Sequence, residues 1–144
     1  SKWNNKDRCA ENRNRKLSDT GRVLFISLIT SGIIAQILKH LIGRERPWST
    51  NILVLIGPSL KKGYDSFPSG HTTLAFCFAY ILSQEFPKHR LLFYMFAVIV
   101  GFQRFEAIEH FPSDILAGII VGISVAKLMC EKLSHGEKLS ACQQ

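Results

Sequence analysis

Acidic residues are scarce in this 144-residue chain: 11 Asp and Glu stand against 18 Lys and Arg, a formal net charge of +7. Charged residues of all kinds reach only 20%, while 47% of residues are hydrophobic, which excludes a disordered chain. The four cysteines, Cys9, Cys77, Cys130 and Cys142, are widely spaced and form no C-x-x-C pair, so neither a zinc site nor a dithiol redox motif is indicated. The positive charge predicts an anionic partner: nucleic acid, a lipid surface or a phosphorylated substrate.

No uncharged run reaches the roughly 20 residues with which a helix crosses a bilayer. Four shorter apolar runs of 12 to 16 residues are present, and hairpin signals are lacking. These runs predict helices over residues 23–38, 72–83, 91–103 and 115–126, with Pro112 in the first turn of the last one. The expected fold is all-α, an antiparallel transmembrane bundle with four helices in this chain.

The distribution of basic residues predicts a topology. If each run crosses a membrane once, residues 1–22, the 85–90 link and the tail share one side, which carries twelve of the eighteen Lys and Arg. That side is expected to be cytoplasmic. The sequence then divides into a basic juxtamembrane segment at 1–22, a membrane domain at 23–133 and a tail at 134–144. A soluble bundle with very apolar helices is the alternative, because the runs are short.

Three clusters of polar residues fall on the opposite, non-cytoplasmic side of this topology. They are Lys39 with Arg46-Pro47, then Pro68-Ser69-Gly70-His71, and finally Arg104 with His110 and Asp114. A helix start such as Ser69-Gly70 favours an anion, because its backbone N–H groups lack intrahelical partners. His110 and Asp114 are four residues apart, so a carboxylate could fix the imidazole tautomer, although Pro112 predicts a helix break between them.

Taken together, the three clusters resemble the signature of the type 2 phosphatidic acid phosphatase superfamily. The resemblance covers roughly residues 39–114. Members with membrane helices commonly have six spans, so the four helices of this chain correspond to the carboxy-terminal set, with two amino-terminal helices missing or absent. One position departs from the family pattern: Gln103 stands where a Ser usually precedes the arginine of the third motif. This departure affects the expected shape of the phosphate pocket.

The resemblance implies a role for each motif residue. His110 would attack phosphorus and form a phosphohistidine, Asp114 would orient it, and His71 would protonate the leaving group and then activate water. The implied phosphate-binding residues are Lys39, Arg46, Ser69, Gly70 and Arg104. No metal and no cofactor are implied, since side-chain cations would balance the phosphate charge. Selectivity is expected in the 48–67 loop and in the groove between helices. Further charged residues near the site, among them Arg44, Glu45, Lys61, Lys62 and Glu109, are expected to be solvated rim charges.

The implied protein is an integral membrane lipid phosphatase that hydrolyses a lipid phosphate monoester or pyrophosphate. Its expected partners are a phosphorylated lipid and membrane lipids, its expected location is a bacterial inner membrane, and its site would face the periplasm or exterior. Two rivals share the anion cradle: a soluble acid phosphatase or vanadate haloperoxidase of the same superfamily, and an inactive phospholipid-binding protein. Nucleic-acid binding is disfavoured, because the basic amino-terminal segment lacks interleaved aromatic residues.

Overall fold

The structure is a computed structural model that describes residues 2–47, 56–58 and 63–141. Four α-helices and one 3-10 turn make up the fold. They are α1 (Lys2–Ile42), α2 (Gly70–Glu85), η1 (Pro87–His89), α3 (Arg90–Glu106) and α4 (Pro112–Ala141). The prediction of an all-α fold with four helices is confirmed, and the described residues contain no strand. Most of the 48–67 loop, with Lys61 and Lys62, lies outside the described residues.

Each helix contains its predicted apolar run and extends beyond it. α1 continues through the basic segment at residues 2–22 without a break, and α4 continues through residue 133 to Ala141. Pro112 begins α4, as predicted, because its fixed φ suits a helix start and its missing N–H would have no intrahelical partner there. The Glu85–Arg90 link forms the short η1 turn, which reverses the chain between α2 and α3.

α2 lies at the centre of the bundle and contacts each of the other three helices. One of its faces packs Phe76 and Ala79 against Ala97 of α3. Its other face packs Cys77 and Ile81 against α1 and α4. Because α2 is packed on all these sides, its first residues are held in a fixed position relative to the other helices.

Two glycines of α4 allow it to cross α2 at very short distance. A Cβ at Gly118 would lie 2.8 Å from the backbone oxygen of Ser69, and one at Gly122 would lie 2.3 Å from the backbone oxygen of Thr73. Their spacing of four residues places both on one face, the small-xxx-small arrangement that lets helices in membranes approach closely. This crossing brings the start of α2 against the start of α4.

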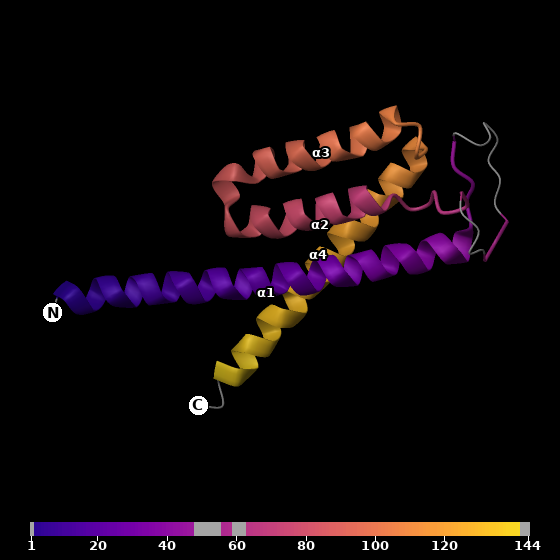
Figure 1. The fold of residues 1–144 in the computed structure, drawn as a ribbon. Helices are drawn as coiled ribbons and strands as arrows, with labels where there is room; N and C mark the ends of the chain where they lie inside the picture. The colour runs from indigo at the N-terminus through magenta and orange to yellow at the C-terminus, as the bar shows by residue number, and fades with distance from the viewer. Residues whose placement is uncertain (1, 48–55, 59–62, 142–144) are drawn as a thin grey trace.

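The antiparallel arrangement gathers the polar clusters at one end of the bundle. The end of α1, the start of α2, the end of α3 and the start of α4 all lie at the right of the molecule in Figure 1. The amino terminus of α1 and the η1 turn lie toward the other end (Figure 1). The three motifs therefore meet in space although they are up to 75 residues apart, from Lys39 to Asp114.

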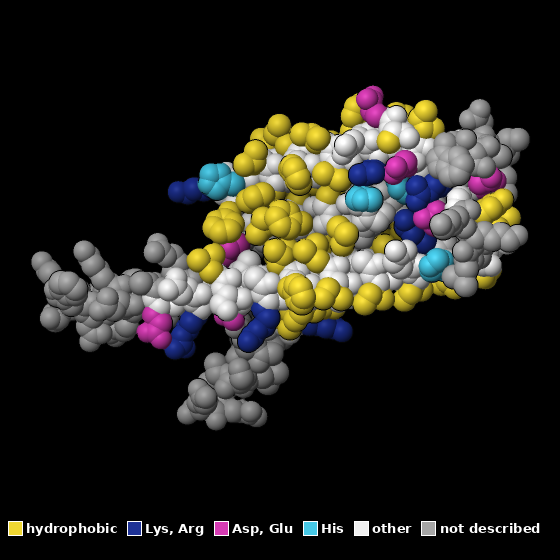
Figure 2. Space-filling model, in the orientation of Figure 1, with side chains coloured by type: hydrophobic (Ala, Val, Ile, Leu, Met, Phe, Trp, Pro, Cys, Tyr) yellow, Lys and Arg dark blue, Asp and Glu magenta, His cyan; other side chains and the backbone are white. Residues whose placement is uncertain are grey.

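Two helical segments are long and apolar enough to cross a membrane. They are Asn14–Ile42 and Pro112–Leu133, each with a mean hydropathy of 1.8 in its most apolar window. Only 17% and 28% of these windows are buried inside the bundle, whereas core helices of soluble proteins are mostly buried. Figure 2 shows the hydrophobic side chains spread over the middle of the visible face, with charged side chains gathered toward its ends. Large exposed side chains such as Phe25, Leu91 and Ile120 contribute to this apolar surface.

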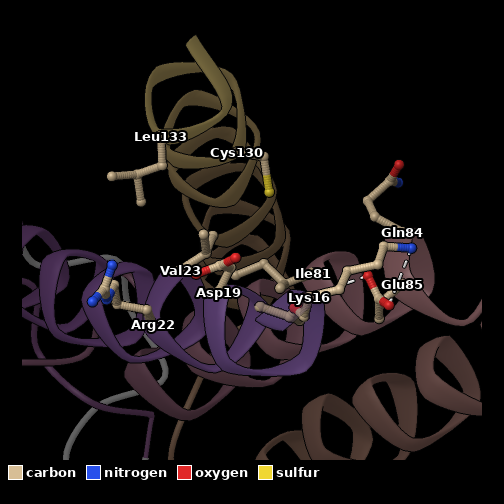
Figure 3. Close-up of a pocket in the computed structure, with 10 residues that line it drawn as sticks. Lys16, Asp19, Arg22, Val23, Ile81, Gln84, Glu85, Cys130 and Leu133 are labelled. Carbon is tan, nitrogen blue, oxygen red and sulfur yellow. Dashed lines mark hydrogen bonds and ion pairs between the residues drawn. The ribbon is translucent and has the colours of Figure 1, made fainter. Parts of the chain in front are cut away.

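A cavity of about 440 Å³ lies away from the motif end, between α1, α2 and α4. Figure 3 shows Lys16 of α1 reaching toward Glu85 of α2, while Asp19 and Arg22 lie farther along α1. Nζ of Lys16 lies 3.2 Å from Oε1 of Glu85, and Thr20 donates a hydrogen bond to the same carboxylate. Two cations and two carboxylates line this cavity, so its charges balance.

Candidate active site

The carboxylate of Asp114 joins the three motif regions. It is completely buried in the first turn of α4. Arg44 donates to its Oδ1, while the Ser66 hydroxyl and the Phe111 N–H donate to its Oδ2. The backbone oxygen of Asp114 also accepts a hydrogen bond from the N–H of Ser69, at 3.0 Å. A single residue of α4 therefore fixes the loop after α1, the approach to α2 and the turn before α4.

His110 is buried in the turn before α4, and its ring orientation is set by a backbone carbonyl. Its Nδ1 lies 2.8 Å from the Ser66 oxygen. Because a carbonyl can only accept, Nδ1 carries the proton and Nε2 of the neutral ring keeps its lone pair. Nδ1 lies 3.8 Å from Oδ2 of Asp114, which is too long for a hydrogen bond. The tautomer expected from an Asp114 contact is thus fixed mainly by Ser66, which sequence reasoning did not identify.

Arg44 is a buried structural cation, so its assignment as a solvated rim charge was wrong. In addition to Asp114, its Nη1 bonds the Ser113 hydroxyl at 2.7 Å, and its guanidinium lies 4.2 Å from the centroid of the Phe111 ring. Glu45 is buried as well. The physical reason is that the buried carboxylate of Asp114 needs a positive partner, and the chain after α1 supplies it.

Arg46, a predicted phosphate ligand, is held in a two-point ion pair. Its Nε and Nη2 donate to the two carboxylate oxygens of Asp65, at 3.0 and 2.8 Å. This hydrogen-bonded pairing holds the pKa of Asp65 below its ordinary value and raises that of Arg46. Backbone hydrogen bonds join the same two stretches, from Arg46 to Gly63 and from Ser66 to Arg44. Asp65 thus orients Arg46 without using all of its N–H donors.

Arg104 at the end of α3 pairs with Glu109 in the following turn. Nη1 of Arg104 lies 3.0 Å from Oε2 of Glu109, which lowers the pKa of that carboxyl group. Ile108, between them, has a positive φ of 54°, a strained conformation for a β-branched residue, and this tight turn aims Glu109 back toward α3. Glu109, predicted to be a solvated rim charge, is partly exposed and is the ion-pair partner of Arg104. Gln103 is exposed one residue before Arg104.

Lys39, Gly70 and His71 line a common cavity of about 200 Å³ between α1 and α2. Lys39 is nearly buried, and a Cβ at Gly70 would lie 3.9 Å from its Nζ. The lack of a side chain at Gly70 therefore leaves room beside the ammonium group. As the first residue of α2, Gly70 also contributes an N–H that no intrahelical carbonyl accepts.

Three other predicted site residues, Lys39, Arg104 and His110, act electrostatically on His71. The charges of Lys39, Arg104 and Glu109, together with the imidazole of His110, lie close enough to His71 to influence it electrostatically. The side chain of His71, which lines the cavity with Lys39, is exposed, whereas the side chain of His110 is buried.

Ser69 differs from the other candidates. It is completely buried, its N–H binds the Asp114 carbonyl, and its hydroxyl accepts a hydrogen bond from Thr72 at 3.0 Å. Ser69 thus fixes the position of the first turn of α2 through these hydrogen bonds. Among the described residues, no group of three or more His, Cys, Asp or Glu side chains is arranged to bind a metal ion.

Comparisons with known proteins define the class of the chain. The family model described as the PAP2 superfamily matches residues 20–134. The chain therefore belongs to the PAP2 superfamily, which confirms the resemblance seen in its three motifs.

Individual relatives are lipid phosphatases by name. The chain is 35% identical over 105 residues to a lipid A 1-phosphatase of Rhizobium johnstonii, an alignment that covers 71% of this chain and 43% of that protein. It is 31% identical over 114 residues to phosphatidylglycerophosphatase B of Bacillus subtilis, covering 72% and 53%. The crystal structure of LpxE of Aquifex aeolicus matches with a TM-score of 0.65 and 26% identity, covering 79% of this chain and 68% of that one. The chain spans about half the length of these curated relatives.

Proposed function

We propose that this protein is an integral membrane phosphatase that hydrolyses the phosphate monoester or pyrophosphate of a lipid through a phosphohistidine intermediate. The observation that carries the proposal is the hydrogen bond from Nδ1 of His110 to the Ser66 carbonyl, since it leaves Nε2 as a nucleophile. This nitrogen belongs to a site where the cations Lys39 and Arg104 and a second imidazole, His71, come together. The names of the relatives point to the same reaction class.

The cationic side chains suit the charge of the substrate. A phosphate monoester carries nearly two negative charges, and its transition state spreads charge over three equatorial oxygens. Arg46 and Arg104 are each oriented by a carboxylate and still have N–H donors to offer, while Lys39 supplies a compact charge beside the Gly70 N–H. Ser69 supports this arrangement by holding the start of α2. No step requires a metal ion, because these groups can carry the electrostatic stabilisation.

The reaction proceeds in two displacements. In the first, Nε2 of His110 forms a bond to phosphorus as the bond to the lipid oxygen breaks, and His71 gives its proton to the leaving oxygen. The resulting imidazolium-type phosphohistidine is stabilised by the nearby carboxylate of Asp114. In the second, His71 takes a proton from water, the hydroxide attacks phosphorus, and the P–N bond breaks to return the lone pair to His110. His71 ends in the protonated form in which it began.

The membrane placement is supported by the two long apolar helices and by the exposed apolar surface. We propose residues 23–133 as the membrane phosphatase domain, with the basic residues 1–22 and the tail 134–144 on the cytoplasmic side. The motif end then faces the periplasm or exterior of a bacterial inner membrane. A soluble acid phosphatase or haloperoxidase would not expose so many large apolar side chains, so the same surface argues against that rival.

The test is phosphate release by the purified protein in detergent, with chelator present, from phosphatidate, phosphatidylglycerol phosphate, a polyprenyl pyrophosphate and lipid A. Release from at least one of these lipids is expected. His110→Ala should lower release by about a thousandfold or more while lipid binding persists, since only the nucleophile is removed. His89→Ala, an exposed histidine of η1 far from the motif end, is the matched control. Unchanged turnover in His110→Ala would refute the nucleophile, and lipid binding without release by the wild-type protein would favour the inactive binding protein.

A further inference from the structure

A long apolar groove lies on the surface of α1, inside the segment that can cross a membrane. It has a volume of about 450 Å³, and its wall includes Leu28, Ile29 and Ile33 of α1 and Leu74 of α2. Ile29 and Ile33 are about half exposed. Among the described residues, this face of α1 is therefore only partly covered by the other helices.

The groove is continuous with the cavity at the motif end. Gly32, Gln36 and Leu74 line both the apolar groove and the smaller cavity that contains Lys39 and His71. Along α1 the lining thus changes from hydrocarbon side chains to Gln36 and then, toward the motif end, to His40 and the cation Lys39. This sequence of surfaces matches an amphiphile with a phosphate at one end and a hydrocarbon chain at the other.

The distances fit such a molecule. Gly32, Gln36 and Lys39 are related by four and three residues, so they lie on one face of α1. At about 1.5 Å of rise per residue, Gly32 lies about 10 Å along the helix axis from Lys39. A phosphate at Lys39 would therefore be followed by a short neutral linker near Gln36 and by hydrocarbon from Gly32 onward.

We propose that the hydrocarbon chain of the phosphorylated lipid substrate lies in this groove of α1, and that the Gly32–Leu74 passage admits it to the phosphate site. The inference rests on the proposed function and specifies how the lipid is bound. Gly32 keeps the passage open: a Cβ there would already lie 3.9 Å from Cδ2 of Leu74, so a longer side chain would occupy the groove. Gly32 and Leu74 thereby determine whether the site acts on esters with long chains.

A second apolar groove competes for the same role. It lies between α3 and α4, has a volume of about 430 Å³ and is lined by Phe102, Phe105 and Leu116 among others. It shares no lining residue with the cavity of Lys39 and His71. The α1 groove is favoured because it alone of the two opens into that cavity.

The experiment compares two substrates with the same phosphate ester, long-chain phosphatidate and glycerol 3-phosphate, which has no chain. The readout is the ratio of kcat/KM for phosphatidate to kcat/KM for glycerol 3-phosphate, with the protein in detergent. Gly32→Leu should lower this ratio about tenfold or more, because it displaces about two methylene groups from the groove. Gly21→Leu is the matched control, since it makes the same change in α1 where nothing lies within 4 Å of the new Cβ.

A second variant keeps the test independent of folding. Leu74→Trp narrows the passage from α2 and should lower the same ratio, and the thermal unfolding midpoint of each variant shows whether it is folded. An unchanged ratio in a folded Gly32→Leu or Leu74→Trp protein would overturn the inference while leaving the proposed function intact. A selective fall in Leu116→Trp would overturn it in favour of the α3–α4 groove. If the wild-type protein releases phosphate from neither substrate nor from the lipid panel, the proposed function fails and the inference fails with it.

Discussion

Removal of the Arg44 guanidinium should destabilise the protein strongly, although Arg44 is not one of the motif residues. Arg44 and Asp114 form an ion pair whose two side chains are 6% and 0% exposed. Breaking a buried pair by removing one partner typically costs about 3–5 kcal/mol, because a charge is left without compensation. In Arg44→Met, Asp114 would still accept hydrogen bonds from Ser66 and Phe111. These remaining bonds place the expected loss at the lower end, about 3 kcal/mol.

A double-mutant cycle separates the ion pair from the loss of side-chain packing. Arg44→Met, Asp114→Asn and the double variant would be unfolded with denaturant in detergent, and the free energy of unfolding compared at constant pH. Because the double variant no longer contains an unpaired buried charge, its loss should be smaller than the sum of the single losses by about 2 kcal/mol or more. Strict additivity, or a loss below about 1 kcal/mol in Arg44→Met, would refute the view that Asp114 is the electrostatic centre of the site.

Two further predictions concern the framework around the site. Gly122→Ala should lower the free energy of unfolding by about 2 kcal/mol or more and reduce phosphatase activity, because its Cβ would lie 2.3 Å from the Thr73 carbonyl oxygen. Gly21→Ala is the control, and it should be neutral or stabilising because nothing lies within 4 Å of its Cβ. Thermal unfolding of both variants checks this, and equal midpoints would contradict the close crossing of α2 and α4. Because the pKa of Asp65 is lowered in the folded state, Asp65 should contribute stability at pH values above its ordinary pKa of 3.8 and lose that contribution as the pH falls through its folded pKa. Asp65 is partly exposed, so the difference in unfolding free energy between wild type and Asp65→Asn should be about 1 kcal/mol or less at neutral pH and should vanish in acid. A difference that grows on acidification would contradict this prediction.

The sequence was sufficient to predict the four helices and to predict that the three motifs lie close together in space. Apolar runs predicted four helices, and their antiparallel order implied that residues near 40, 70 and 110 share one end of the bundle. Helix lengths were underestimated, because a charged residue ends an apolar run without ending a helix: α1 begins at Lys2, well before the run that starts at residue 23.

The partners of the motif residues could not be predicted, because they depend on contacts between distant segments. Arg44 and Arg46 are separated by one residue, and nothing local distinguishes the one that pairs with buried Asp114 from the one that pairs with Asp65. Ser66 was overlooked for a similar reason. Its backbone oxygen accepts a hydrogen bond from His110, 44 residues away. Every residue has a backbone carbonyl, so the residue type does not indicate which carbonyl makes such a contact. The pairing of Arg104 with Glu109 is more local, since the two lie five residues apart, at the end of α3 and in the turn that follows it.

The central claim is that Nε2 of His110 attacks phosphorus within a site that includes His71. The most direct measurement is the mapping of labelled phosphate on His71→Ala after brief reaction with p-nitrophenyl phosphate, quenched in alkali, where phosphohistidine survives. This substrate has a leaving group that needs no proton, so the variant should form the intermediate and hydrolyse it slowly. The account predicts the label on His110 and its absence from the His71→Ala/His110→Ala double variant; label on another residue, or label that persists in the double variant, would contradict it.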